Sequence, residues 1–138
     1  MNYYLNSCSF DPYINNMEKL TDKEEEVMMI IWELEKAFVK EVRERFPEPR
    51  PHINTVATVM RKLADKDYLA FEDFGSVHRF YPVVSKEDYT KSQLTPKMTR
   101  LFGNSFKNVV AFFAKEDKIS ADELKEIIDM IEKGEDDK

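Results

Sequence analysis

The first regular pattern along the chain is helical and opens with Thr21 and Glu24, which stand three residues apart. This is the spacing of a capping box, in which each residue bonds the backbone of the other at a helix N-terminus. Val27, Ile31 and Leu34 follow at intervals that place them on one face of a helix. The pattern therefore predicts a helix that begins at about residue 22.

A second, shorter helix is expected between Phe38 and Phe46, with Val42 on its apolar side. Prolines at positions 47, 49 and 51 follow at once. Because proline lacks an N–H group and clashes with the preceding turn, none of them fits inside a helix. The proline-rich segment is thus a linker between two helices.

The third helical segment, residues 52–66, has two faces. Its apolar face is predicted to hold Ile53, Val56, Met60 and Leu63. Its polar face is predicted to hold Asn54, Thr58, Arg61 and Asp65, with Thr55, Ala57 and Lys62 on the flanks. Short polar side chains with nearby cations suit a helix that lies in a DNA major groove, although any solvated surface helix alternates in the same way.

The segment after this helix favours a β-hairpin. Residues 68–71 and 77–84 are rich in aromatic and β-branched side chains, and residues 73–76 have the composition of a turn. Three helices followed by a hairpin predict a winged helix-turn-helix domain, whose third helix contacts DNA beside the hairpin. A three-helix protein-interaction module is the alternative, but it would not need a hairpin that carries His78 and Arg79 beside a polar helix face.

The last third of the chain is predicted to be helical and to dimerise. A helix is expected from Ser85 to Ser92, with Pro96 kinking or ending it, and Ser120 and Glu123 form a second capping box. Apolar side chains are too dense there for so short a segment to cover, unless it folds back onto the first helix as a monomer. The predicted dimer contacts are Leu101, Phe102, Phe106, Val109, Val110, Phe113, Leu124, Ile127, Ile128 and Ile131.

The expected fold is mainly α with a small β-hairpin wing, an α+β class. We expect an N-terminal extension without assigned function at residues 1–16, a winged-helix DNA-binding domain at 17–85 and a helical dimerisation domain at 86–138. The 138 residues carry a net charge of −6, which argues against indiscriminate coating of nucleic acid, because phosphates attract positive charge.

Composition also bears on other classes of function. Cys8 is the only cysteine, so neither an internal disulfide nor a thiolate metal cluster is expected. His52 and His78 are separated by a helix and a strand, and nothing suggests a convergent catalytic site. We therefore expect no enzyme, cofactor, metal or small-molecule substrate. The absence of a long apolar run and of a signal pattern predicts a cytoplasmic protein.

Five stretches carry a family resemblance: LTDKEEEVMMIIW (20–32), VKEV (39–42), NTVATVMRKL (54–63), YPVVSKEDY (81–89) and FGNSF (102–106). In this order they resemble the penicillinase and methicillin-resistance repressors, over residues 19 to about 132. The resemblance implies a homodimeric repressor of transcription that binds a palindromic operator in double-stranded DNA and controls a regulon related to antibiotic resistance. A protein-protein interaction module without DNA binding is the alternative.

The resemblance also assigns roles by position. The DNA-facing residues would be Asn54, Thr55, Ala57, Thr58, Arg61 and Lys62, with residues 76–79 as the wing. In the family, a membrane sensor-protease that responds to β-lactams leads to cleavage of the repressor, and the corresponding bond here joins Phe112 and Phe113 in place of an Asn-Phe pair. Asp67 stands where a glycine is common, and Ser76 where arginine is, which would move a wing–phosphate contact to Arg79.

Overall fold

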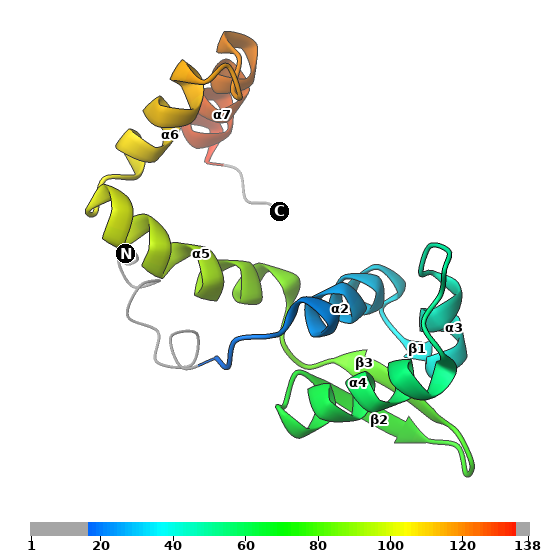
Figure 1. Cartoon of the computed structure of the whole chain (residues 1–138). Helices are drawn as coiled ribbons and strands as arrows, with labels where there is room; N and C mark the ends of the chain where they lie inside the picture. The colour runs from blue at the N-terminus through cyan, green and yellow to red at the C-terminus, as the bar shows by residue number, and fades with distance from the viewer. Residues whose placement is uncertain (1–16, 135–138) are drawn as a thin grey trace. The chain divides into compact units, whose positions relative to one another are not determined.

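The computed structural model describes residues 17–134, which form two compact units that meet in the chain at Leu94 and Thr95 (Figure 1). We call residues 17–94 the winged-helix unit and residues 95–134 the C-terminal unit. Helices and one small three-stranded antiparallel sheet make up the described chain. The predicted α+β winged-helix fold is confirmed. The extension at residues 1–16, with Cys8, lies outside the described residues.

Helix α2 (Asp22–Leu34) starts with the predicted capping box. The Thr21 hydroxyl accepts the Glu24 N–H at 3.2 Å, and the Glu24 carboxylate accepts the Thr21 N–H at 2.9 Å. These bonds satisfy two backbone donors that the helix itself leaves free. Val27 and Ile31 are fully buried on the inner face of the helix.

Helix α3 (Val39–Glu44) is shorter than the apolar pattern suggested, because strand β1 (Ala37–Phe38) takes its first residues. Ala37 pairs with Phe80 and Phe38 with Arg79 of strand β3. A strand of two residues cannot show an alternating pattern, so β1 was not predicted.

Helix α4 (Ile53–Asp65) lies where the two-faced pattern placed it, with the His52 Nδ1 atom accepting the Asn54 N–H at 3.0 Å as the N-cap. Its buried side chains are Val56, Val59, Met60 and Leu63. Ile53 was expected among them and is instead 38% exposed, in the first turn of the helix, whereas Val59 is buried without having been predicted. After the helix, Asp67 adopts a left-handed φ of 66°, the conformation for which glycine is common.

Strands β2 (Leu69–Asp73) and β3 (His78–Pro82) form the predicted hairpin, and the sheet has the order β1-β3-β2 (Figure 1). Gly75, at φ +87°, makes the turn, and its N–H is accepted by the Asp73 carboxylate at 2.9 Å. We call this hairpin the wing. Leu69 and Phe80 are buried against the helices.

Helix α5 (Lys86–Phe102) begins in the winged-helix unit and ends in the C-terminal unit. Pro96 was expected to kink or end it, but the helix continues for six residues beyond the proline. Proline removes only one intrahelical bond, and Gly103, at φ +63°, follows the last helical residue. Tyr89 is buried in the core of the winged-helix unit, which thus extends past residue 85.

The C-terminal unit contains α6 (Phe106–Lys115) and α7 (Ala121–Lys133). The predicted capping box opens α7, since the Ser120 N–H donates to Glu123 at 2.8 Å and the Glu123 N–H to Ser120 at 3.1 Å. No residue of either helix is buried. Among the described residues, no helix is long and apolar enough to cross a membrane.

Candidate nucleic-acid interface

The outer face of α4 presents the polar side chains that the sequence predicted. Asn54, Thr55, Thr58, Arg61 and Lys62 are all exposed, and Ala57 is half-buried. The buried Val56, Met60 and Leu63 hold the opposite face in the core, so the helix cannot turn without opening it. The residues near the start of α4 are small, which allows its outer surface to approach a binding partner closely.

A groove separates α4 from the wing. It has a volume of about 430 Å³, and we call it the wing groove. Its lining comes from α3 and the residue before it, from α4 and from the wing: Phe38, Val39, Lys40, Ile53, Ala57, Arg61, Ser76, Val77, His78 and Phe80. Most of these side chains are apolar, and the basic ones stand at α3, α4 and the wing.

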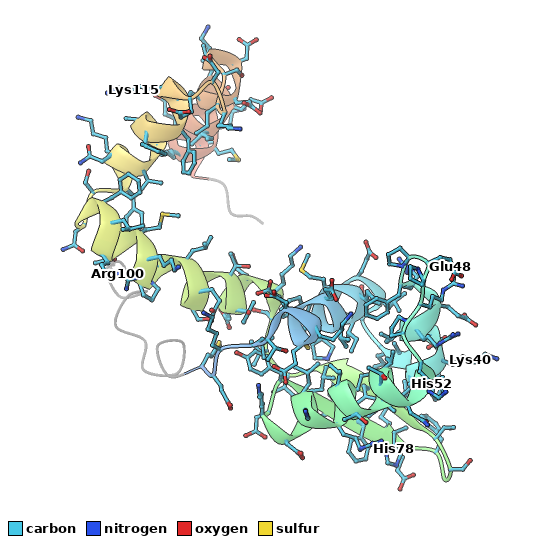
Figure 2. All side chains as sticks on the ribbon, viewed as in Figure 1. Lys40, Glu48, His52, His78, Arg100 and Lys115 are labelled. Carbon is cyan, nitrogen blue, oxygen red and sulfur yellow. The ribbon has the colours of Figure 1, made fainter. Side chains whose placement is uncertain are left out.

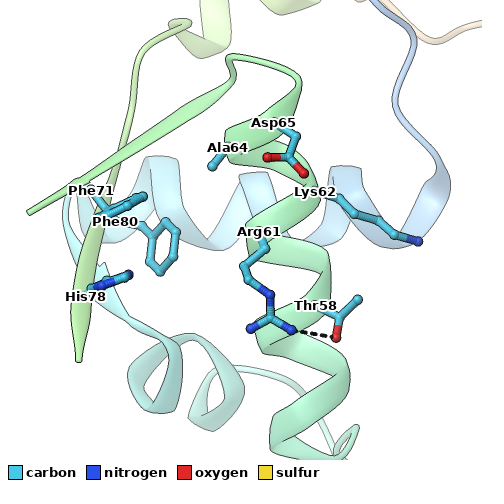
Figure 3. Close-up of a pocket in the computed structure, with 8 residues that line it drawn as sticks. All are labelled: Thr58, Arg61, Lys62, Ala64, Asp65, Phe71, His78 and Phe80. Carbon is cyan, nitrogen blue, oxygen red and sulfur yellow. Dashed lines mark hydrogen bonds between the residues drawn. The ribbon is translucent and has the colours of Figure 1, made fainter. Parts of the chain in front are cut away.

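A second hollow, of about 350 Å³, continues between α4 and the wing on the side of Lys62 and Asp65 (Figure 3). Arg61 and His78 line both hollows. Figure 3 shows Arg61 on the side of α4 that faces the wing, where its Nη2 atom donates to the Thr58 hydroxyl at 3.2 Å. Arg61 therefore lies between the two elements that a winged-helix domain uses on DNA.

Three cations on this face are free of ion pairs within residues 17–134: Lys40, Arg61 and Lys62. Lys40 extends outward from α3 (Figure 2). Lys36 and Lys66, by contrast, both pair with carboxylates. An exposed cation without a carboxylate partner can neutralise a phosphate without first losing an internal contact.

The wing places His78 and Arg79 on opposite faces of the sheet. His78 faces α4, and its ring stacks on Phe71 with the ring centres 4.2 Å apart (Figure 3). Arg79, the next residue along the strand, points to the other face. There its guanidinium donates to one Glu72 oxygen from Nε at 2.9 Å and from Nη2 at 2.8 Å.

The contact between Arg79 and Glu72 is reinforced by its surroundings. The hydrogen bonds from Arg79 are the main reason that the pKa of Glu72 lies below its usual value. The guanidinium also lies 5.3 Å from the centre of the Phe74 ring. The structure thus brings His78 together with Arg61, and gives Arg79 an internal partner away from them.

The profile of the penicillinase repressor family matches residues 20–133. This chain belongs to the penicillinase repressor family. The match confirms the resemblance seen in the sequence, and this is a family of transcriptional repressors, not of enzymes. A comparison with curated proteins gives no match.

Within this family fold, the position of α4 is fixed at its C-terminal end as well as by its apolar face. Lys66 donates to the Glu24 carboxylate of α2 at 2.7 Å. Burial alone would raise the pKa of Glu24, but the hydrogen bonds from Lys66 and Thr21 outweigh it and lower this pKa below its usual value. The buried carboxylate thereby ties the end of the candidate recognition helix to the start of α2.

Sequence reasoning missed Lys40 as a member of this site. Lys40 lies in the VKEV stretch that contributed to the resemblance, but nothing local tells that it borders the same groove as Arg61. The pairing of β1 with β3 brings the start of α3 beside the wing. Within residues 17–134, no three His, Cys, Asp or Glu side chains come close enough to hold a metal ion.

Proposed function

We propose that this member of the penicillinase repressor family represses transcription in the cytoplasm as a homodimer on a palindromic operator, with α4 in the major groove. The observation that carries the proposal is the face built by α4 and the wing groove, where Lys40, Arg61 and Lys62 lack carboxylate partners among the described residues. The short polar side chains on the outer face of α4 can reach base edges, and the unpaired cations beside them can bind phosphates.

Individual roles follow from the chemistry of each side chain. Asn54 can pair with adenine, and Thr55 and Thr58 can place methyl groups against thymine. Arg61 or Lys62 can bond guanine or a phosphate. Ala57 allows the backbone of α4 to come close to the bases.

We assign the wing contacts to His78 and, at the mouth of the groove, to Lys40. Arg79, which sequence reasoning placed on the DNA, would first have to leave Glu72. Its role in the proposal is therefore to stiffen the wing, with the phosphate contact passing to Lys40. Ser76 is small and lines the groove without adding charge.

The proposed dimer interface lies in the C-terminal unit. Its helices expose Leu101 by 70% and Ile131 by 72%, and a second copy of the chain would cover such surfaces. The proposed contacts are Leu101, Phe102, Phe106, Val109, Val110, Phe113, Leu124, Ile127, Ile128 and Ile131. Two linked winged-helix units, which we call the DNA-binding heads, bind a palindrome far more tightly than one such unit does.

Repression would end by cleavage between Phe112 and Phe113, in a regulon related to β-lactam resistance and in response to a membrane sensor-protease. In the single chain both side chains are partly exposed, at 48% and 37%. A cut in α6 would detach Phe113 and the contacts of α7 from the DNA-binding part, and so would weaken the proposed dimer without altering α4. Mass spectrometry of the protein from induced cells tests this step, because transcription that rises while the chain stays intact contradicts it.

Footprinting on the DNA upstream of the protein's own gene tests the main proposal. We expect symmetric protection that weakens steeply with salt, because each neutralised phosphate releases counterions. A protein-interaction module with the same fold would give no footprint. Protection of a single, asymmetric half-site by the full-length chain would contradict the dimer on a palindrome.

A further inference from the structure

The start of α5 is fixed to the winged-helix unit through Tyr89, whose side chain is only 5% exposed. Its ring lies between two others, with its centre 5.7 Å from the Trp32 ring of α2 and 5.8 Å from the Tyr68 ring after α4. Its hydroxyl donates to the Glu25 carboxylate at 2.6 Å. A single residue of α5 is therefore in contact with two other parts of the same unit.

The chain just before α5 is bonded to α2, and the helix just after Tyr89 has a side-chain bond of its own. The Trp32 indole N–H donates to the Val84 carbonyl at 2.9 Å, just before α5 begins. One turn after Tyr89, the buried Ser92 donates its hydroxyl to the Tyr89 carbonyl at 2.7 Å. Burial first, and the Glu25 carboxylate second, raise the pKa of Tyr89, so its phenol keeps the proton that this contact needs.

These contacts stop near the end of the unit. Leu94 is 48% exposed, and Pro96 has no N–H to donate to the carbonyl of Ser92. The start of α5 is therefore tied to the winged-helix unit by Tyr89 and by the chain just before the helix, whereas the turn that holds Pro96 has one backbone bond fewer. Tyr89 is the residue of α5 whose side chain contacts both α2 and the segment after α4.

We infer that Tyr89 is a positioning residue: it fixes the direction in which α5 leaves the DNA-binding head and so sets the half-site spacing that the dimer accepts. The inference rests on the proposed function. Two heads on a stiff arm gain most from linkage when the spacing matches, and lose that gain when it does not. Two heads joined through a flexible α5 tolerate other spacings, but they lose more conformational entropy when both are bound.

Operator binding by the full-length protein tests the inference with Tyr89→Leu, which removes ring and hydroxyl, and with Tyr89→Phe, which removes only the bond to Glu25. Tyr81→Leu and Tyr81→Phe are matched controls, because Tyr81 is a half-buried tyrosine on β3 that lies over Lys36. Three duplexes are compared: the operator, the operator with its half-sites moved apart by about half a turn, roughly five base pairs, and one half-site.

We expect Tyr89→Leu to weaken binding to the operator roughly tenfold, a part of the 10²–10⁴-fold gain that linkage can give. Its affinity for one half-site should match the wild type, and its preference for the native spacing should shrink. Tyr89→Phe should lower the operator affinity and the preference for the native spacing by smaller factors. An equal loss on half-site and operator overturns the inference, since Tyr89 would then only stabilise the head. Unchanged spacing preference in Tyr89→Leu overturns it too.

A measurement without DNA separates this inference from the proposed function. Spin labels at Glu44→Cys and Thr90→Cys, in a chain with Cys8→Ser, report the distance between α3 and α5 inside the winged-helix unit. We expect a narrow distribution that broadens with Tyr89→Leu and not with Tyr81→Leu. Broadening in a protein that binds no operator leaves the positioning role and removes the proposed function. An equally narrow distribution in Tyr89→Leu removes the positioning role alone.

Discussion

The winged-helix unit buries its apolar side chains, whereas the C-terminal unit leaves many of its own exposed. Every buried hydrophobic residue of the described chain lies between Leu20 and Tyr89, in the winged-helix unit. The helices α6 and α7 are also amphipathic, and α7 opens with a capping box like that of α2, yet neither of them buries a residue. A helical pattern thus tells which face is apolar, but not whether the same chain covers it.

The difference also separates two kinds of stability. The winged-helix unit closes its core with its own residues, so its folding does not require a partner. The C-terminal unit leaves Leu101 and Ile131 largely in water, and burying such area is worth roughly 25 cal/mol per Å². Its stability should therefore depend on protein concentration, as in a unit completed by a second copy.

The largest expected effect comes from removing the C-terminal unit altogether. A chain that stops after Leu94 keeps Tyr89 and the whole core, so we expect a folded monomer. Its operator affinity should fall by roughly 10²–10⁴-fold, because the two half-sites no longer bind as one unit. Ultracentrifugation and fluorescence anisotropy measure both quantities. A truncated chain that still dimerises would contradict the proposal that the C-terminal unit forms the dimer interface.

Paired apolar-to-alanine substitutions test the contrast directly. Leu63→Ala, at a fully buried position of α4, should lower the free energy of unfolding of the winged-helix unit by about 2–5 kcal/mol. Ile131→Ala removes a side chain of the same size from an exposed position of α7. It should leave that unit unchanged and weaken the dimer, seen as a stronger dependence of Tm on concentration. Equal destabilisation of the winged-helix unit by both variants would break the comparison.

A third test compares two unpaired cations of the interface. Arg61→Ala should cost about 1–3 kcal/mol of operator affinity and relax the preference for one base, if Arg61 contacts a base edge. Lys40→Ala should weaken binding to all DNA sequences alike. It should also reduce the slope of log affinity against log salt concentration by about one, as expected for a phosphate contact. Arg79→Ala is the control, because its cation is already paired with Glu72. Loss of base preference in Lys40→Ala instead would reverse the two roles.

Sequence patterns predicted the parts of the fold that depend on near neighbours. The capping boxes at Thr21 and Ser120 and the turn at Gly75 act over a few residues, so each could be recognised in the sequence. The burial of Val56, Met60 and Leu63 followed from the period of α4, whereas Ile53 was expected in the core and is exposed, and Val59 is buried without having been predicted. The left-handed conformation of Asp67 agrees with the resemblance, in which a glycine is common at this position, and not with a rule for aspartate itself.

The features that could not be predicted depend on contacts between distant segments. Strand β1 exists because Ala37 and Phe38 pair with β3, and this pairing also brings Lys40 to the wing groove. The partner of Arg79 is fixed by the register that sets Glu72 opposite it. Sequence alone could nominate Arg79 as a DNA contact, but only the folded hairpin shows that its cation is engaged.

The smallest expected effect concerns acid sensitivity, which the winged-helix unit should show through Glu24. The hydrogen bonds from Lys66 and Thr21 hold its pKa below the usual value of a Glu carboxyl in the folded state. Its contribution to stability is therefore present above the unfolded-state pKa and is lost as the pH falls through the folded-state value. Glu24→Gln keeps an acceptor for both contacts but removes the charge. It should lower the free energy of unfolding at neutral pH and flatten the decline of this free energy as the pH falls through the folded-state pKa of Glu24.

Urea unfolding of the chain that stops after Leu94, followed from neutral pH down to about pH 3, measures this difference without the dimer. Glu26→Gln, on the same helix, is the matched control, because the Glu26 carboxylate is 58% exposed and pairs with Lys23 at the surface. Exposed pairs of this kind contribute at most about 1 kcal/mol. The wild-type and Glu24→Gln curves should converge as the pH falls, since a protonated Glu24 also lacks the charge that attracts Lys66. Parallel curves with no convergence would mean that Glu24 acts only through its shape and its capping bond.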